Sequence, residues 1–428
     1  MHTSKVILFH KIQMIMKSRF SKFGILLCLA IPFVSTSQTV NIGELAISTG
    51  TQMSSVGAID NKTTGDIIND GELIVYSHFN NDGLVTFTPG RSTGITRMRG
   101  ITGFQDISGT MPMEWYNAEF DNRNVQPGFH LSNELSISGQ ANFEKGIVDD
   151  KSYNGLLIFE KNATYINADD ISHVNGLVQK NGSDAFRFPI GDKGKYRYAA
   201  ISNPNAVTDS FAGQFFFENS NPLFAHSSKD SNITLIDNAE YWKIEKTAAN
   251  SNVFLTLSWN TTTTPSAIYA NPTDEIHIVR WDTTSNSWID EGGVADSASR
   301  EVTMVINSLT KYGVFTLARI RTNLDLEIFN AVTPNGDGLN DFFRVDGLAS
   351  HPNNTVTIFN RWGVLVYETK SYGNAVGGNV FTGYSDGRVT VDRNERLPVG
   401  TYFYVIEAVN ENDGSKTNKA GYLYINEK

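Results

Sequence analysis

Cysteine is almost missing from this chain, whose 428 residues include only Cys28. Cys28 lies in an apolar stretch near the N-terminus, so the chain after that stretch has no thiol for a disulfide or a thiolate metal site. We therefore expect the fold to be stabilised by core burial, with or without a bound metal ion.

Positive charge is also scarce, because 35 Lys and Arg residues stand against 45 Asp and Glu residues. The formal net charge of -10 argues against nucleic acid as a partner, since its phosphates require clustered basic side chains. Catalytic signatures are missing too: there is no His-Glu-x-x-His, no Gly-x-Ser-x-Gly and no phosphate loop. These absences favour a protein that is not an enzyme.

The titratable residues form no obvious catalytic group. Beyond the N-terminal stretch the histidines are scattered singly, at His78, His130, His173, His226, His277 and His351. Two pairs of adjacent acids, Asp149-Asp150 and Asp169-Asp170, would lie on opposite faces of a strand, which does not suit paired acid and base catalysis. Asp169-Asp170 is better explained as a solvated corner, or as a remote calcium candidate.

The first 37 residues have the features of a secretory signal peptide. Basic residues between positions 17 and 22 precede an apolar run, Phe23 to Val34, that is too short to span a bilayer. Small residues at positions 35 to 37 then predict cleavage before Gln38. The segment carries five basic residues and no acidic one, so its removal changes the formal net charge from -10 to -15. An exported protein is expected.

Residues 38 to 183 repeat a short theme, in which a turn signal precedes a short alternating strand. The copies are Ile42 to Ile47, Asp70 to Val75, Asp82 to Phe87, Asn133 to Ile137, Asn154 to Phe159 and Asn175 to Val178. Such repetition, with Asn and Gly at the corners, predicts a right-handed β-solenoid. The Asn69 and Asn81 copies would stand one short coil apart. An ordinary β-meander is the alternative, because the spacing is irregular between Ser108 and Val125.

Residues 184 to 322 predict a β-sandwich, because strands with period-2 alternation are separated by short loops. The expected strands are Phe186 to Asp192, Gly213 to Phe217, Tyr241 to Glu245, Phe254 to Trp259, Ile276 to Trp281, Val302 to Ile306 and Tyr312 to Ala318. Trp242, Trp259, Trp281 and Trp288 are expected in the core, with Trp281 and Trp288 facing each other across a hairpin. The alternative for these four rings is a glycan-binding face.

Residues 326 to 428 can be laid out as about seven short strands, the size of an immunoglobulin-like β-sandwich. The strands are expected near Glu327 to Phe329, Phe343 to Val345, Val356 to Asn360, Leu365 to Glu368, Val380 to Thr382, Tyr402 to Ala408 and Gly421 to Asn426. Alternation places Tyr402, Tyr404 and Ile406 on one face of their strand, with Phe403 and Val405 on the other. The chain as a whole is predicted to be all-β.

Four motifs mark this last segment. They are Thr333-Pro334-Asn335-Gly336-Asp337-Gly338-Leu339-Asn340-Asp341, Ile358-Phe359-Asn360-Arg361-Trp362-Gly363, Leu397-Pro398-Val399-Gly400-Thr401-Tyr402-Phe403-Tyr404 and Lys419-Ala420-Gly421-Tyr422-Leu423-Tyr424-Ile425. Together they resemble the gliding-motility-associated C-terminal domain of Bacteroidetes, also called the type B sorting domain of the type IX secretion system. Phe381-Thr382-Gly383 stands where that family has a Trp-Asp-Gly-like element, and Arg388 to Arg396 looks like a charged insertion.

The resemblance implies passage through the type IX outer-membrane translocon. The translocon and its substrate shuttle protein are the implied partners, and the implied destination is the cell surface or the medium.

The loop from Asn335 to Asp341 is the candidate metal site. Asn335, Asp337 and Asp341 carry side-chain oxygens, and Leu339 offers a carbonyl, at alternate positions that can converge on one calcium ion. The alternative is turn chemistry, because Asx side chains hydrogen-bond to their own backbone. Calcium is the one cofactor that the sequence suggests.

Recognition by the export machinery is expected on the same domain. Arg361 stacked on Trp362, beside Gly363, could present a docking surface. The alternative places Trp362 in the core and pairs Arg361 with an acid such as Asp337. The other candidate recognition residues are Gly400, Thr401, Tyr402 and Gly421.

Three functions stay open for the exported chain. The first is a non-catalytic cell-surface protein that serves adhesion, gliding motility or surface-complex assembly, with surface glycans or other surface proteins as partners. The second is a β-helical polysaccharide lyase or hydrolase, whose acids and bases would lie in a groove. The third is an accessory that stays bound to the translocon.

Overall fold

The computed structural model describes residues 38–270, 275–304, 309–321, 326–361, 363–373, 379–386, 396–409 and 416–426. The predicted signal peptide, Trp362 and residues 388–395 of the expected insertion lie outside them. Regular structure in the described part is nearly all β, with a short helix α2 (Ser266–Tyr269) and a 3-10 turn η2 (Leu348–Ser350). No helix among these residues is long and apolar enough to span a membrane.

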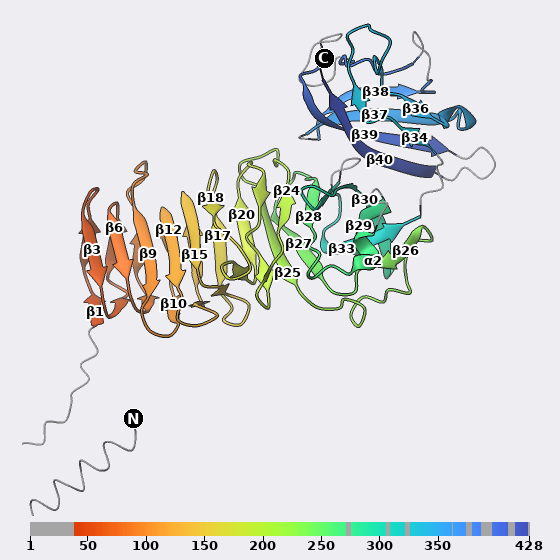
Figure 1. Cartoon of the computed structure of the whole chain (residues 1–428). Coiled ribbons are helices and arrows are strands. Elements are labelled where there is room, and N and C mark those ends of the chain that lie inside the picture. The colour runs from red at the N-terminus through yellow and green to blue at the C-terminus, as the bar shows by residue number, and fades with distance from the viewer. Residues whose placement is uncertain are drawn as a thin grey trace, which may run out of the picture. The chain divides into compact units, whose positions relative to one another are not determined.

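Residues 38 to 181 form a parallel β-solenoid of three sheets, which confirms the predicted solenoid (Figure 1). Sheet A contains β1 (Gln38–Asn41), β4 (Ala58–Asn61), β7 (Phe79–Asn81), β10 (Gln105–Gly109), β13 (Phe129–Leu131), β16 (Val148–Asp149) and β19 (Val174–Asn175). Sheet B contains β2 (Glu44–Ile47), β5 (Asp66–Asn69), β8 (Leu84–Thr86), β11 (Met113–Trp115), β14 (Glu134–Ile137), β17 (Leu156–Phe159) and β20 (Val178–Asn181). Sheet C contains β3 (Gln52–Ser55), β6 (Glu72–Val75), β9 (Ile95–Gly100), β12 (Asn117–Asn122), β15 (Gln140–Lys145) and β18 (Thr164–Ile166). Each of six complete turns gives one strand to each sheet.

The turns of the solenoid differ in length, which explains the irregular spacing of the sequence repeats. Asn61 pairs with Asn81, 20 residues later, whereas Asn80 pairs with Ser108, 28 residues later. The extra residues fall in loops between strands, so the inward positions of sheet A stay aligned. Because of that alignment, every turn buries its apolar residues on the turn before it.

An asparagine ladder stabilises the corner between sheets A and B. Asn41 Nδ2 donates to Asn61 Oδ1, and Asn61 Nδ2 donates to Asn81 Oδ1, over 2.8 Å in each case. Asn61 and Asn81 have no exposed surface, and Asn61 Nδ2 also lies 3.0 Å from the carbonyl oxygens of Gly65 and Leu84. A Cβ at Gly65 would lie 2.2 Å from Asn61 Oδ1, so this corner requires glycine.

The expectation that the Asn69 and Asn81 copies lie at equivalent positions, one turn of the solenoid apart, was wrong. Asn81 ends β7 in sheet A and is aligned with Asn61, whereas Asn69 ends β5 in sheet B. In both copies the asparagine Oδ1 accepts the backbone N–H two residues later, from Gly71 at 3.1 Å and from Gly83 at 3.2 Å. The same turn chemistry therefore serves two different corners of the solenoid.

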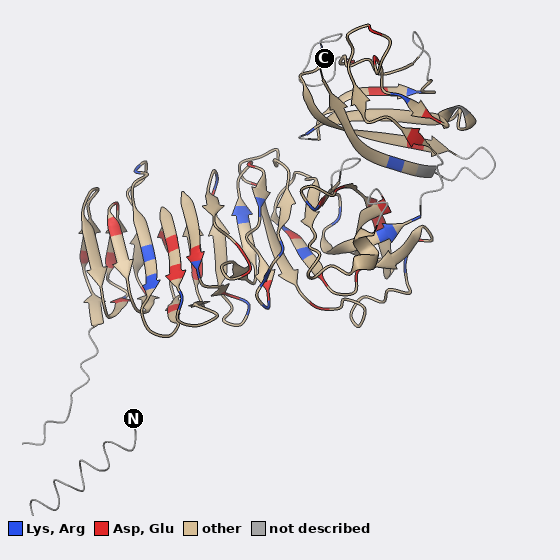
Figure 2. Ribbon diagram, in the orientation of Figure 1, with Lys and Arg blue, Asp and Glu red and all other residues tan. Residues whose placement is uncertain are grey.

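Charged residues on the outer face of sheet C pair with one another along neighbouring strands (Figure 2). Arg97 Nε lies 2.5 Å from Glu72, and Arg97 also contacts Glu119. Arg99 lies 2.8 Å from the same Glu119. Because these charges neutralise each other, this face offers no strong potential of one sign.

Sheet B continues beyond β20 with antiparallel strands. In spatial order they are β25 (Ser210–Phe216), β27 (Tyr241–Ala248), β33 (Gly313–Ile320), β29 (Ile276–Asp282) and β30 (Ser287–Gly292), while β26 (Ile233–Ile236) pairs with β33. A second sheet has the order β21 (Phe186–Arg187), β24 (Ala199–Ile201), β28 (Leu255–Ser258), β32 (Glu301–Thr303) and β31 (Val294–Asp296). A hairpin of β22 (Gly191–Asp192) and β23 (Lys195–Tyr196) lies between β21 and β24 in the chain.

One hydrophobic cluster runs through the solenoid and the middle segment, joining residues such as Phe159, Val178, Phe188 and Leu255. The change from parallel to antiparallel pairing falls between β20 and β25, close to the expected boundary at residue 183. The sandwich architecture and the boundary itself stay predictions.

The tryptophans of the middle segment mostly serve the core. Trp242 and Trp288 are fully buried. Trp281 and Trp288 pair across the β29–β30 hairpin, with ring centroids 5.7 Å apart, as the sequence predicted. These residues are therefore not an exposed glycan-binding face.

The C-terminal segment contains a five-stranded sheet. Its order is β35 (Ala331–Val332), β40 (Lys416–Ile425), β39 (Gly400–Val409), β37 (Asn354–Asn360) and β38 (Leu365–Lys370), and β34 (Glu327–Ile328) pairs with β36 (Val345–Asp346). Tyr402 and Tyr404 belong to one hydrophobic cluster and Phe403 and Val405 to another, which confirms the predicted alternation. The expected strand at residues 380–382 was wrong: Phe381 is a buried core residue outside any strand. The immunoglobulin-like fold stays a prediction.

Candidate functional site

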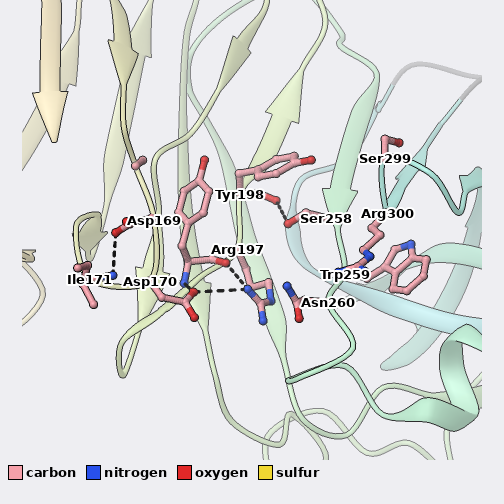
Figure 3. Close-up of a pocket in the computed structure, with 12 residues that line it drawn as sticks. Asp169, Asp170, Ile171, Arg197, Tyr198, Ser258, Trp259, Asn260, Ser299 and Arg300 are labelled. Atoms are coloured by element: carbon pink, nitrogen blue, oxygen red, sulfur yellow. Dashed lines mark hydrogen bonds and ion pairs between the residues drawn. The ribbon is translucent and has the colours of Figure 1, made fainter. Parts of the chain in front are cut away.

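Two adjoining cavities lie where the last corner of the solenoid meets the five-stranded sheet of the middle segment. The first has a volume of about 590 Å³ and the second about 680 Å³. Both are lined by Ala168, Tyr196 and Tyr198, so they form one groove. We call it the tyrosine groove, lined by residues 162–171, 184–187, 196–198, 258–260 and 299–300. Figure 3 shows the first cavity.

Three tyrosines form a wall of this groove. The hydroxyl oxygens of Tyr165 and Tyr196 are 2.9 Å apart, and the ring centroids of Tyr196 and Tyr198 are 5.9 Å apart. Burial raises the pKa of each of the three phenols above its ordinary value. All three hydroxyls are therefore neutral at physiological pH and can donate or accept hydrogen bonds.

Tyr198 is held in place by two charged neighbours. The guanidinium of Arg187 lies over the Tyr198 ring, 4.0 Å from its centroid. Arg187 Nη2 lies 2.7 Å from Glu301 Oε1, and the Tyr198 hydroxyl donates to the same oxygen. One face of the Tyr198 ring is thus covered by a cation–π contact, and its hydroxyl is anchored.

The groove also contains the acid pair that the sequence placed at a solenoid corner. Asp169 Oδ1 accepts the backbone N–H of Ile171 over 2.9 Å, and Asp170 Oδ1 accepts that of Tyr196 over 2.9 Å. Asp170 also lies 3.8 Å from Arg197 (Figure 3). Asp169 and Asp170 are therefore anchored at the groove by backbone hydrogen bonds.

Arg197 connects the groove with a buried acid behind it. Its side chain is 4% exposed, its Nε donates to Thr263 Oγ1 over 2.7 Å, and it lies 3.7 Å from Glu240. Glu240 has no exposed surface, and burial raises the pKa of its carboxyl. Arg197 is thus held rigidly between Asp170 in the groove and Glu240 in the interior.

Of the four tryptophans of the middle segment that the sequence analysis named, Trp259 is the one that lines the groove. It is 6% exposed and stacks on Tyr269, with ring centroids 5.2 Å apart. The three tyrosines were missed by sequence reasoning. The alternation of Tyr196 and Tyr198 about the buried Arg197 was the signal that could have found two of them.

A second group of aromatic and polar side chains lies on the outer face of sheet A. His130 is stacked between Phe104 and Tyr153, with ring centroids 4.1 and 4.0 Å away. Asp106 carboxylate oxygens lie 3.1 Å from His78 Nδ1 and 3.2 Å from His130 Nδ1. These two histidines, which are far apart in sequence, therefore share one carboxylate.

The candidate calcium loop is a set of Asx turns in this structure. Asn335 Oδ1 accepts the Asp337 N–H at 3.0 Å, and Asp337 Oδ1 accepts the Leu339 N–H at 2.8 Å. The two Asp341 oxygens accept the N–H groups of Gly336 and Gly338, at 2.7 and 2.8 Å. Three of the loop's four carboxylate oxygens thus accept backbone N–H groups, which is turn chemistry, and Asp337 Oδ2 accepts a hydrogen bond from Asn335 Nδ2 over 2.9 Å. In the described part of the chain no group of three or more His, Cys, Asp or Glu is arranged to hold a metal.

The expected recognition residues lie on several elements of the C-terminal segment. Gly363 has a φ of +76°, Thr401 is exposed on β39, and Gly400 begins that strand. The Tyr402 hydroxyl donates to the Pro398 carbonyl over 2.8 Å. Arg361 and Gly421 are among the described residues, whereas Trp362 is not, so the expected stacking lies outside the structure. Their role in recognition stays a prediction.

The C-terminal segment matches a known protein family. Residues 326–425 match the CHU_C Type IX secretion signal domain, which confirms the resemblance drawn from the four motifs. Such a domain implies export across the outer membrane, to the cell surface or beyond. No curated protein and no solved structure matches the chain. The chain thus combines a β-solenoid with a C-terminal segment that matches a type IX secretion signal domain.

Proposed function

We propose that this protein is a non-catalytic adhesin of the cell surface that binds a glycan chain in the tyrosine groove. The observation that carries the proposal is the wall of Tyr165, Tyr196 and Tyr198, three neutral phenols beside polar groups. Its type IX secretion signal domain fits delivery to the surface.

A sugar ring presents an apolar face of C–H groups and a rim of hydroxyls, and the groove offers a partner for each. The half-buried rings of Tyr196 and Tyr198 supply apolar surface. Asp170, Asn260 and Ser299 line the first cavity with oxygen and nitrogen atoms. Volumes of this size, with a few fixed polar groups, are typical of small-ligand sites.

The acids of the groove favour binding over catalysis. Asp169 and Asp170 each accept a backbone N–H, and Asp170 is also close to Arg197. Glu240 lies behind Arg197 without solvent contact. A glycosidase requires two carboxyl groups that flank one bond. The groove-lining acids are this adjacent pair and Asp184, whose Oδ2 accepts hydrogen bonds from the Asn162 N–H and Lys180 Nζ over 2.6 Å each.

The test is binding of the chain from residue 38 to residue 428 to a panel of polysaccharides, measured by affinity electrophoresis and calorimetry. Replacing Tyr196 or Tyr198 with Ala should weaken binding about tenfold or more, because each removes a stacking surface. Tyr153→Ala is the matched control, since Tyr153 is 37% exposed on the solenoid outside the groove. Unchanged affinity in both groove variants, each shown by its melting transition to be folded, would contradict the proposal.

The cellular role can be tested in parallel. A strain that lacks the protein should attach less to glycan-coated surfaces, and the Tyr196→Ala chain should not restore attachment. If the Tyr196→Ala chain restored attachment, adhesion would not depend on the tyrosine groove.

A second candidate is a polysaccharide lyase or hydrolase, favoured by Asp170, Arg197 and Tyr196 in one cavity of a β-solenoid protein. Incubation with the same polysaccharides and measurement of new chain ends tests it. Turnover that is lost in Asp170→Asn, with binding retained, would replace the adhesin proposal.

We also propose the translocon and its shuttle protein as partners of the C-terminal domain during export. Affinity purification of the chain from membranes is the test, and persistent co-purification after export would favour an accessory of the translocon.

Calcium binding at Asn335, Asp337, Leu339 and Asp341 is tested by calorimetric titration with Ca²⁺. Heat that is lost in Asp337→Ala would support the metal site.

A further inference from the structure

The first turn of the solenoid, residues 38 to 57, has a neighbouring turn on one side only within the described chain. Its strands β1, β2 and β3 stand at the ends of sheets A, B and C, and they pair with β4, β5 and β6. At the other end, sheet B continues into β25. The two ends of the solenoid are therefore different, and at the N-terminal end the strand edges have no partner among the described residues.

The free edge carries backbone groups that can pair with a further strand. The carbonyls of Asn41 and Ile47 accept N–H groups of the second turn, at 2.9 Å each. Backbone groups of successive strand residues face opposite sides, so those of Val40 and Ala46 face away from the second turn. Such a row of unpaired donors and acceptors is a template for strand addition.

The asparagine ladder is also open at this end. Asn61 Oδ1 and Asn81 Oδ1 each accept a hydrogen bond from the asparagine of the preceding turn. Asn41 Oδ1 accepts none from any described residue. A strand that carried an amide side chain at this level would donate to Asn41 Oδ1 and extend the ladder by one step.

The first turn lacks the devices that normally protect a free edge. Residues 38 to 57 include no Lys, Arg or Pro, and Glu44 is their one charged residue. Val40, Ile42 and Val56 are 51%, 71% and 67% exposed. Solenoids usually end in a polar capping repeat, whereas this end exposes three apolar side chains and is nearly uncharged.

We propose that this end of the solenoid is a docking surface, which accepts an extended, uncharged segment of another protein as an additional turn in parallel register with β1 and β2. A second copy of this chain fits less well. If the N-terminal ends of two copies met, Asn41 Oδ1 of one copy would face Asn41 Oδ1 of the other, and neither oxygen could donate a hydrogen bond. Stacking on the other end of a second copy is prevented by β25. The partner segment carries an Asn or Gln at the ladder position and apolar residues where Leu45 and Met53 need cover.

The probe is a fluorescent synthetic peptide with the sequence of residues 38–57 and a lysine tail for solubility, titrated with the chain from residue 38 to residue 428. Its anisotropy should rise to saturation. A peptide with Leu in place of the ladder asparagine should bind more weakly, because it leaves Asn41 Oδ1 without a donor.

Ala46→Pro is the decisive variant. It removes one N–H from the free edge, where proline is tolerated, without removing a hydrogen bond to the second turn. Peptide affinity should fall about tenfold or more, while Ala46→Ser, which keeps the N–H, should bind as the unchanged chain does. Ile42→Lys, which adds charge at an exposed position, should also weaken binding.

Melting temperatures of the variants show whether each one is folded. Absence of saturable peptide binding would overturn the proposal. It would also be overturned if the folded Ala46→Pro and Ile42→Lys variants bound the peptide as tightly as the unchanged chain does. Concentration-dependent dimerisation in light scattering, abolished by Ala46→Pro and without peptide binding, would also overturn it in favour of a second copy.

Discussion

The hydroxyl oxygens of Tyr165 and Tyr196 lie 2.9 Å apart, and this contact joins β18 of the solenoid to β23 of the following hairpin. Burial raises the pKa of both phenols, so both carry their protons and one donates to the other. The position of Tyr196 in the groove is thus fixed by a residue of the solenoid.

Removing either hydroxyl should destabilise the chain, because the remaining one loses its partner in a half-buried site. Tyr165→Phe and Tyr196→Phe should each lower the free energy of unfolding by about 1 kcal/mol, and the double variant by less than their sum. Urea denaturation measures the coupling. Tyr116→Phe is a control outside the groove. Additive losses would show that the two hydroxyls do not interact.

The asparagine ladder predicts a contrast between neighbouring residues of the solenoid. Asn61→Leu should cost about 2–4 kcal/mol of unfolding free energy, because it leaves buried carbonyl and amide groups without partners. The control is Asn80→Leu on the adjacent strand, where Asn80 faces outward and is half-buried. Chemical denaturation compares the two. Equal losses would mean that the ladder adds nothing beyond surface contacts.

The fold of the first half could be predicted because its corner chemistry is local. Asn69 and Asn81 each bond to an N–H two residues later, and such a turn is visible in sequence. The sheet to which each corner belongs is set by pairing with residues a whole turn away. That is why the sequence wrongly predicted that the Asn69 and Asn81 copies lie one turn of the solenoid apart.

The groove could not be predicted in the same way. Tyr165 and Tyr196 are 31 residues apart, and Trp259 comes from a third part of the chain. The acid pair was noticed as a solenoid corner, but its place beside Arg197 depends on how the hairpin packs on that corner. The signal domain, in contrast, carries its motifs within one continuous segment, and sequence was sufficient for it.

Asp150 should make stability depend on pH. Its side chain is 2% exposed, one oxygen accepts the Leu177 N–H over 2.9 Å, and burial raises its pKa well above the usual range. Above pH of about 4 the unfolded chain loses this proton while the folded chain keeps it, so stability falls as pH rises towards the folded pKa.

The Asp150→Asn variant cannot ionise, so its melting temperature should fall less between pH 5 and pH 8 than that of the unchanged chain. Asp149→Asn is the matched control, because Asp149 is the adjacent acid of the same pair. Parallel pH profiles for all three chains would show that Asp150 is ionised in the folded state.

Export should depend on Gly421, which pairs with Tyr404 between β39 and β40. A Cβ at Gly421 would lie 2.3 Å from the Tyr404 hydroxyl, whereas one at Gly373 would have no atom within 4 Å. Gly421→Ala should therefore disturb the sheet of the signal domain and retain the protein inside the cell, and Gly373→Ala should be exported normally. Immunoblotting of surface, medium and periplasmic fractions measures both. Normal export of Gly421→Ala would show that the machinery does not require this sheet to be intact.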